Sequence, residues 1–306
     1  MTLFILKRVA RLMLIVVGAL TIMFLLQRIS GDPVTLLLPD LSDEQQAIQL
    51  REDLGLDQPL YVQFGRFMGG TLTGDLGMSY IQRQPVTDIV MNRLPETLKL
   101  AFFAVVLATV GGTIFGALGA LWRGKLADRL LIAGSLLGQS IPTFWLGIML
   151  ILVFAVFLGW LPASGNDTWR HIILPGVTLA AFNLARTTRI ARASMVETLS
   201  QDYIRTARSK GAGELRVVVY HALKNASISV VTVTAFMFST LIGGAIVTEV
   251  VFAWPGIGRL IVDSVLARDF PVVLGAVFVT AVLVAVTYML LDIIYRLLDP
   301  RIGSTR

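Results

Sequence analysis

The sequence predicts an all-α integral membrane protein with six transmembrane helices and an extracytoplasmic segment between the first two. Of its 306 residues, 55% are hydrophobic and only 15% are charged, whereas soluble domains average about 25% charged residues. In addition, six apolar segments approach or exceed the roughly 20 residues that a helix needs to cross a bilayer. We place these spans at residues 9–29, 98–121, 130–158, 172–192, 226–251 and 272–295.

The first span follows Lys7, Arg8 and Arg11, and such positive charges also precede cleaved signal peptides. Its apolar run is longer than the hydrophobic region of a signal peptide, and no small-residue cleavage site follows it. We therefore interpret it as a retained span. The chain then divides into residues 1–30 with the first span, an extracytoplasmic segment at 31–97, and a five-helix core at 98–306.

The extracytoplasmic segment begins with Gly31-Asp32-Pro33, which predicts a turn. Residues 42–55 predict a short helix with Ser42 as its N-cap and Gly55 as its C-cap. The glycine-rich stretch 69–80 predicts a loop. Composition leaves open whether this segment is a connecting lid or a docking surface for an external partner.

Proline and glycine mark expected breaks within the core. Pro142 lies early in the third span and predicts a kink there. Gly243-Gly244 in the fifth span permits close helix packing. That span ends in EVVFAWPGIGR (249–259), where Pro255 and Gly256 predict a turn.

The distribution of Lys and Arg predicts the orientation in the membrane. An even number of spans places both termini on one side, and short loops rich in Lys and Arg stay in the cytoplasm. The short segments between spans two and three and between spans four and five, together with both termini, carry most of these residues. We therefore predict that both termini are cytoplasmic.

Nothing in the sequence indicates catalysis or a bound cofactor. The chain has no Cys, and His171 and His221 lie on opposite sides of the predicted membrane, so no metal site is expected. GALWRGKL (119–126) resembles a phosphate-binding loop, but Leu126 replaces the required Ser or Thr. Any ATP and Mg²⁺ must therefore be bound by another chain. The net charge of +6 is explained by the membrane topology, so we expect no nucleic acid partner.

No charged residue is expected in the middle of a predicted span. Proton-driven transporters often carry ionisable residues there, so this pattern disfavours an ion-coupled secondary transporter without excluding one. A membrane scaffold or receptor without transport activity also stays open.

A basic helix pair follows the fourth span. Ser200 is the expected N-cap of a helix at 201–210, Gly211 is the expected left-handed residue that ends it, and a second helix begins near Gly213 or Glu214. Leu215, Val218, Val219, Ala222, Leu223 and Ala226 are the apolar positions of a single predicted stripe. The pair fits either an interfacial helix bound to anionic lipid or a rigid knob that enters a groove on a cytoplasmic partner.

YIRTARSKG…HALKNA (203–226) resembles the "EAA" loop of bacterial ABC importer permeases of the dipeptide, oligopeptide and nickel type. The place of the Glu-Ala-Ala core is taken by Thr206-Ala207-Arg208. Further stretches resemble the same family in the same order, so that the similarity covers nearly the whole chain: LGLDQPLYVQF (54–64), GDLGMSY (74–80), SIPTFWLG (140–147), HIILPGVTL (171–179), FAWPGIGR (252–259), RDFPVV (268–273) and LDPRI (298–302).

The resemblance implies the six-helix fold of type I ABC importers and a permease subunit that is not itself an enzyme. It implies three kinds of protein partner besides the lipid bilayer: a second homologous permease, two ABC ATPases that bind ATP and Mg²⁺, and an extracytoplasmic solute-binding protein. The location would be the bacterial inner membrane. Residues 200–226 would be the coupling loop, and its expected ATPase contacts are Tyr203, Arg205, Ala207, Arg208, Lys210, Gly211 and Glu214.

The cargo implied by the resemblance is a di- or oligopeptide, with glutathione and nickel or a metal chelate as alternatives. We expect small or polar residues of the middle spans, such as Ser140 and Asn183, to line the substrate path.

Overall fold

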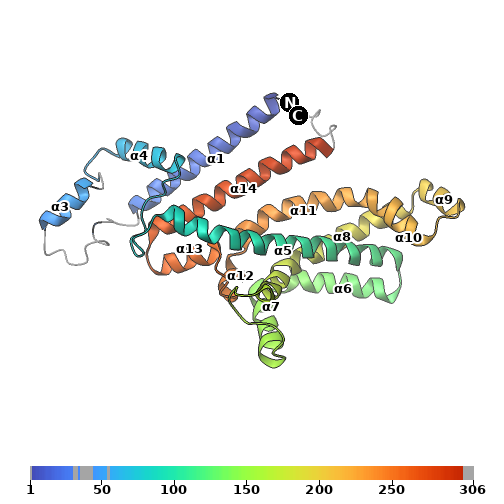
Figure 1. The fold of residues 1–306 in the computed structure, drawn as a ribbon. Helices are drawn as coiled ribbons and strands as arrows, with labels where there is room; N and C mark the ends of the chain where they lie inside the picture. Colours follow the sequence, from blue (N-terminus) through green and yellow to red (C-terminus); the bar gives the residue numbers. More distant parts are fainter. Residues whose placement is uncertain (1, 30–33, 35–43, 54–55, 299–306) are drawn as a thin grey trace. The chain divides into compact units, whose positions relative to one another are not determined.

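The computed structural model describes residues 2–29, 34, 44–53 and 56–298. Regular structure in this part is helical, and an isolated β-bridge joins Met78 to Pro85. Figure 1 shows the helices in chain order. They are α1 (Thr2–Ile29), α3 (Glu44–Asp53), α4 (Leu60–Leu72), α5 (Val86–Leu121), α6 (Leu126–Ser140), α7 (Thr143–Leu150), the π-helix η1 (Ile151–Phe157), the 3₁₀-helix η2 (Trp169–Ile172), α8 (Ile173–Leu199), α9 (Asp202–Ser209), α10 (Glu214–Arg216), the π-helix η3 (Val217–Leu223), α11 (Lys224–Gly244), α12 (Ile246–Val251), α13 (Ile257–Leu266) and α14 (Phe270–Leu298).

Each of the six predicted spans coincides with a helix or a pair of helices. By length and hydropathy, α1, α5 and α14 could each cross a membrane, and two bent pairs raise the number to five among the described residues. The bent pairs are α6 with α7 and η1 (105°), and residues 214–227 with 229–243 (47°). The predicted span at 172–192 is α8. This helix is long enough to cross a membrane, but it carries Arg186, Arg189 and Arg192 and is more polar than the five candidate spans.

The 105° bend confirms the break predicted at Pro142. This residue lies between α6 and α7 and serves as the N-cap of α7. Proline cannot donate a backbone hydrogen bond and its ring clashes with the preceding turn, so a helix bends sharply there.

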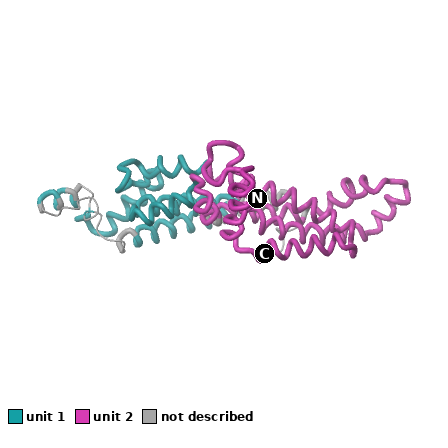
Figure 2. The backbone as a smooth tube through the Cα atoms, turned by 90° about the horizontal axis from the view of Figure 1, so that it is seen from below, with its two compact units in different colours: residues 1–95, 256–289 teal, residues 96–255, 290–306 magenta. Residues whose placement is uncertain are grey.

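The chain forms two compact units (Figure 2): Met1–Pro95 with Gly256–Met289, and Glu96–Pro255 with Leu290–Arg306. In the first unit, α1 packs on α14 through Leu20, Met23 and Phe278, and the Phe24 ring meets Phe64 edge-on at 5.3 Å. Gly275 of α14 accommodates Val86 so closely that a Cβ there would lie 2.5 Å from the valine side chain.

A buried carboxylate fastens the loop before α5 to the turn before α14 within the first unit. Ser79 donates a short hydrogen bond to Asp269, and the Tyr80 backbone N–H donates to Asp269 Oδ1 at 3.1 Å. The glycine-rich stretch 69–80 is a loop only in part, because α4 continues to Leu72. The helix predicted at 42–55 is α3, whereas Ser42, Gly55 and the turn at 31–33 lie outside the described residues.

In the second unit, α8 packs against α6, α7, α11 and part of α5. A Cβ on Gly116 of α5 would lie 2.5 Å from the Ala191 Cβ and 2.8 Å from backbone atoms of α8. Glycine thus permits close packing here, as was predicted for Gly243. In contrast, beyond the neighbouring part of its own helix, no atom of the described residues lies within 4 Å of the Cβ position of Gly243.

Two buried polar contacts fix the ends of the second unit. At one end, Arg192 donates from Nε and Nη2 to the Asp128 carboxylate at 2.5 and 2.7 Å. The same carboxylate accepts the Gly124 backbone N–H, so the GALWRGKL stretch is a helix-to-helix turn. At the other end, fully buried Glu249 accepts a hydrogen bond from Thr97 at 2.7 Å.

We expect Gly116→Ala to lower the thermal stability of the protein. The added methyl group overlaps the backbone of α8, and overpacking of this kind costs about 1–3 kcal/mol. Gly134→Ala on α6 is the matched control, because no atom lies within 4 Å of its Cβ position. Thermal unfolding in detergent should give a lower Tm for Gly116→Ala only, and equal Tm values would contradict the packing described for α5 and α8.

Candidate coupling surface and translocation cavity

The predicted coupling loop is a helix, a glycine turn and a second helix, formed by α9, Gly211 and α10. Gly211 has φ +82°, a left-handed conformation that strains any residue with a Cβ. The turn is closed by a hydrogen bond from the Gly211 N–H to the Arg208 carbonyl at 2.9 Å. Arg208 also donates to both carboxylate oxygens of Glu214, at 2.7 and 3.2 Å, across the turn.

The start of this loop differs from the prediction. Ser200 does not cap α9; it is the C-cap of α8, and its hydroxyl donates to the Glu197 carbonyl at 2.7 Å. The N-cap of α9 is Gln201, whose side chain makes no capping hydrogen bond. The helix therefore begins at Asp202, where a carboxylate is favoured by the helix dipole.

The apolar stripe predicted for the second helix is also only partly correct. Val218, Ala222 and Ala226 are buried, but Leu215 is 80% exposed and Val219 is half exposed. For Val219 the cause is η3, because a π-helix has a wider turn than an α-helix and changes which positions share a face. Leu215 lies before η3, in α10. Val217, which the stripe omitted, is fully buried.

One apolar side chain fixes α9 to the rest of the unit. Ile204 is fully buried in a cluster with Met195 of α8, Ala120 of α5 and Val217 of η3. Asn225 of α11 donates to the Tyr203 hydroxyl at 2.7 Å on the other side. Sequence reasoning missed Ile204, although it is the single large aliphatic residue in DYIRTARS, which is the signal that could have identified it.

The predicted contact residues gather on the side of the loop that faces away from this cluster. Tyr203, Arg205, Arg208, Lys210, Gly211 and Glu214 are exposed, and Ala207 is half buried. Leu215 and Tyr220 add exposed apolar surface beside these charges. The loop thus presents a mixed basic and apolar surface on a firmly packed base.

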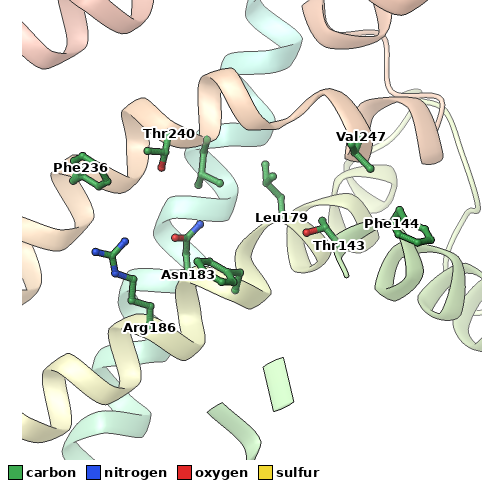
Figure 3. A pocket seen from close by; sticks show the side chains of 10 residues that line it. Thr143, Phe144, Leu179, Asn183, Arg186, Phe236, Thr240 and Val247 are labelled. Carbon is green, nitrogen blue, oxygen red and sulfur yellow. The ribbon is translucent and has the colours of Figure 1, made fainter. Parts of the chain in front are cut away.

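A cavity of about 490 Å³ lies within the same unit and is lined by residues of α7, α8, α11 and α12. Asn183, one of the two residues predicted for the substrate path, lines this cavity and is 8% exposed. Ser140 does not line it; its hydroxyl donates to the Leu136 carbonyl within α6. Figure 3 shows the arrangement of the cavity side chains. The complete lining comprises Thr143, Phe144, Leu179, Phe182, Asn183, Arg186, Phe236, Thr240, Leu241 and Val247.

The sequence analysis missed Arg186. The predicted span ended at residue 192, which placed this arginine near a cytoplasmic end, and no charge was expected away from span ends. The helix continues to Leu199, so Arg186 lies at the midpoint of α8 rather than near its end. Its position one turn after Asn183 is the signal that could have identified it.

The described residues contain no group of three His, Asp or Glu side chains placed to hold a metal ion. His171 instead helps to cap the 3₁₀-helix η2, because its Nδ1 accepts a hydrogen bond from the backbone N–H of Thr168, the N-cap residue, at 3.1 Å.

Relatives of known description match the whole length of the chain. Residues 108–304 match the family "Binding-protein-dependent transport system inner membrane component", and residues 1–101 match its N-terminal counterpart. The chain is 42% identical over 301 residues to the glutathione transport system permease protein GsiC of Escherichia coli O6:H1 strain CFT073, E. coli strain K12 and Shigella dysenteriae serotype 1. These alignments cover 98% of both chains.

Two solved structures share the fold. An inward-facing form of the MetNI methionine ABC transporter superposes with a TM-score of 0.58 at 21% identity, over 69% of this chain and 96% of the other. An amino acid ABC transporter crystallised with histidines gives 0.54 at 20% identity, over 69% and 94%. The importer-permease fold predicted from the sequence is thereby confirmed. The chain belongs to the family of inner membrane components of binding-protein-dependent transport systems, and it is the permease subunit of an ABC importer.

Proposed function

We propose that this permease carries short peptides into the cell, with glutathione as the first candidate cargo. The observation that carries the proposal is the 42% identity, over nearly the entire chain, to permeases named for glutathione transport. Glutathione is a tripeptide, so it belongs to the peptide class that the sequence resemblance implied. A cavity of about 490 Å³ also falls within the range of roughly 300–1,000 Å³ that small-molecule sites occupy.

The energy for transport would come from two ATPase subunits that dock on the coupling loop. The support is the combination of an exposed surface and a rigid base: Arg205 and Lys210 are accessible, while Ile204 beneath them is fully buried. A short helix held in this way moves as a body and can push α8, which a mobile loop could not do. A second permease would complete the pathway, and an extracytoplasmic binding protein would deliver the cargo.

The orientation in the membrane forms part of the proposal. The coupling loop and both termini would be cytoplasmic, and the loop before η2 would be extracytoplasmic. The support is the concentration of Lys and Arg in the segments assigned to the cytoplasm.

We expect the reconstituted importer to take up radiolabelled glutathione or a tripeptide in an ATP-dependent and vanadate-sensitive manner. The assembly would contain this chain, a second permease, two ATPases and the cognate binding protein, in proteoliposomes loaded with ATP. Omitting the binding protein is the control and should abolish uptake. Uptake of a nickel chelate with no uptake of either peptide would overturn the cargo assignment.

We expect Gly211→Asp to abolish uptake while the protein still inserts in the membrane. At φ +82° a residue other than glycine costs about 1–2 kcal/mol of strain and distorts the turn. Gly213→Asp is the matched control, because it adds the same charge two residues away at φ −65°, with no atom within 4 Å of its Cβ position. Uptake and membrane content are measured together, and normal uptake by Gly211→Asp would refute the coupling assignment.

The natural absence of Cys permits a direct test of orientation. Lys125→Cys and Asn166→Cys are both at exposed positions, on opposite sides of the third predicted span. A membrane-impermeant maleimide should label Asn166→Cys from the outer side and Lys125→Cys only in inside-out vesicles. The reverse pattern would invert the proposed topology.

A further inference from the structure

We infer that Arg186 forms a carboxylate-binding subsite in the cavity of the second unit. This inference rests on the proposed peptide cargo and specifies which chemical group of the peptide the permease holds. It starts from the three arginines of α8, Arg186, Arg189 and Arg192, which are spaced three residues apart.

Two of these arginines donate hydrogen bonds to side chains of the described residues, whereas Arg186 makes a cation–π contact and forms no ion pair there. Arg192 forms the ion pair with Asp128 at 2.5 Å, and Arg189 donates to the Gln139 side chain at 2.8 Å. Arg186 forms no ion pair with any described residue, and its guanidinium lies 5.9 Å from the centroid of the Phe236 ring. Because Arg186 lines the cavity and has no acidic partner among the described residues, its guanidinium is available to an anionic ligand.

The surroundings of Arg186 suit a carboxylate. Among the described residues, the cavity lining contains no acidic side chain, and Arg186 is its single charged residue. Asn183 lies one turn away on the same helix, and Figure 3 shows both side chains beside α11. The side chains of Asn183 and Thr143 make no hydrogen bond to other described residues, so both are available to a ligand.

The chemistry of arginine also suits a carboxylate. The guanidinium is planar and can donate two parallel hydrogen bonds to the two oxygens of a carboxylate. Apolar side chains such as Phe236 form much of the cavity lining. Few other polar groups therefore compete with Arg186 for the carboxylate of a peptide.

Uptake of paired probes by the complete importer tests the subsite. The probes are glutathione and trialanine, each as the free acid and as its C-terminal amide, presented on saturated binding protein. For wild type and Arg186→Gln, the ratio of acid uptake to amide uptake is measured. The acid-to-amide ratio of Arg186→Gln is then divided by that of the wild type. Because the same binding protein serves both permeases, its own preference for acid or amide cancels.

We expect the acid-to-amide ratio to fall about tenfold in Arg186→Gln, as for loss of one charge-assisted hydrogen bond. Arg186→Lys should retain part of the preference, because it keeps the charge but not the planar fork. Arg189→Gln is the matched control, since Arg189 lies on the same helix outside the cavity lining, and its ratio should equal that of the wild type.

Two results would overturn the inference. An unchanged ratio in Arg186→Gln would show that the carboxylate is not held there. An equal fall in acid and amide uptake would indicate that Arg186 pairs with the second permease or supports the fold. Both results leave peptide import itself intact. Failure of the proposed function would give a different result: the wild-type protein would import neither glutathione nor trialanine, as the acid or as the amide.

Discussion

The close packing of α8 against its neighbours is the constraint on which the second unit depends. Gly112 and Gly116 of α5 face Thr187 and Ala191 of α8 with no room for a methyl group. Without a hydrophobic driving force between helices in lipid, small residues that let backbones approach are the main source of packing energy. The pair of buried Asp128 and half-buried Arg192 then sets the axial register, because a shift of α8 along α6 would leave the buried carboxylate without its partner.

This packing makes α8 a rigid connection between the two functional regions. Arg186 in the cavity and Leu199 at the helix end are 13 residues apart, which corresponds to about 20 Å along the axis. Beyond Leu199, Ile204 of α9 is buried against Met195 of α8, so the coupling loop and the helix share one apolar cluster. Displacement of the loop therefore displaces the helix that carries the cavity residues, and the bend at Pro142 lets α7 respond separately from α6.

The features that the sequence predicted well are those that depend on one residue and its backbone. A proline inside an apolar span predicts a bend, and a glycine after a basic helix end predicts a left-handed turn; Pro142 and Gly211 confirmed both. The failures came from features that depend on tertiary contacts. The π-helix η3 altered the buried face around Val217, Ser200 completed the preceding helix, and the length of α8 moved Arg186 from a helix end to a helix centre. None of these features can be predicted from the local sequence pattern. Where a long helix ends depends on the neighbouring helices that pack against it, and these contacts are not visible in the sequence.

The modest polarity of the cavity is consistent with a pathway rather than a storage site. Transport requires a ligand to be held well enough to enter and weakly enough to leave. One unpaired arginine and a few free polar groups among aromatic side chains supply a single strong contact in an otherwise apolar lining. Because that contact is made from α8, any movement of α8 relative to α11 changes the distance between the guanidinium and the residues opposite it, such as Thr240. Under the proposed coupling and the proposed subsite, the helix that receives the push from the coupling loop would also be the helix that holds the cargo, so that release would follow directly from the movement.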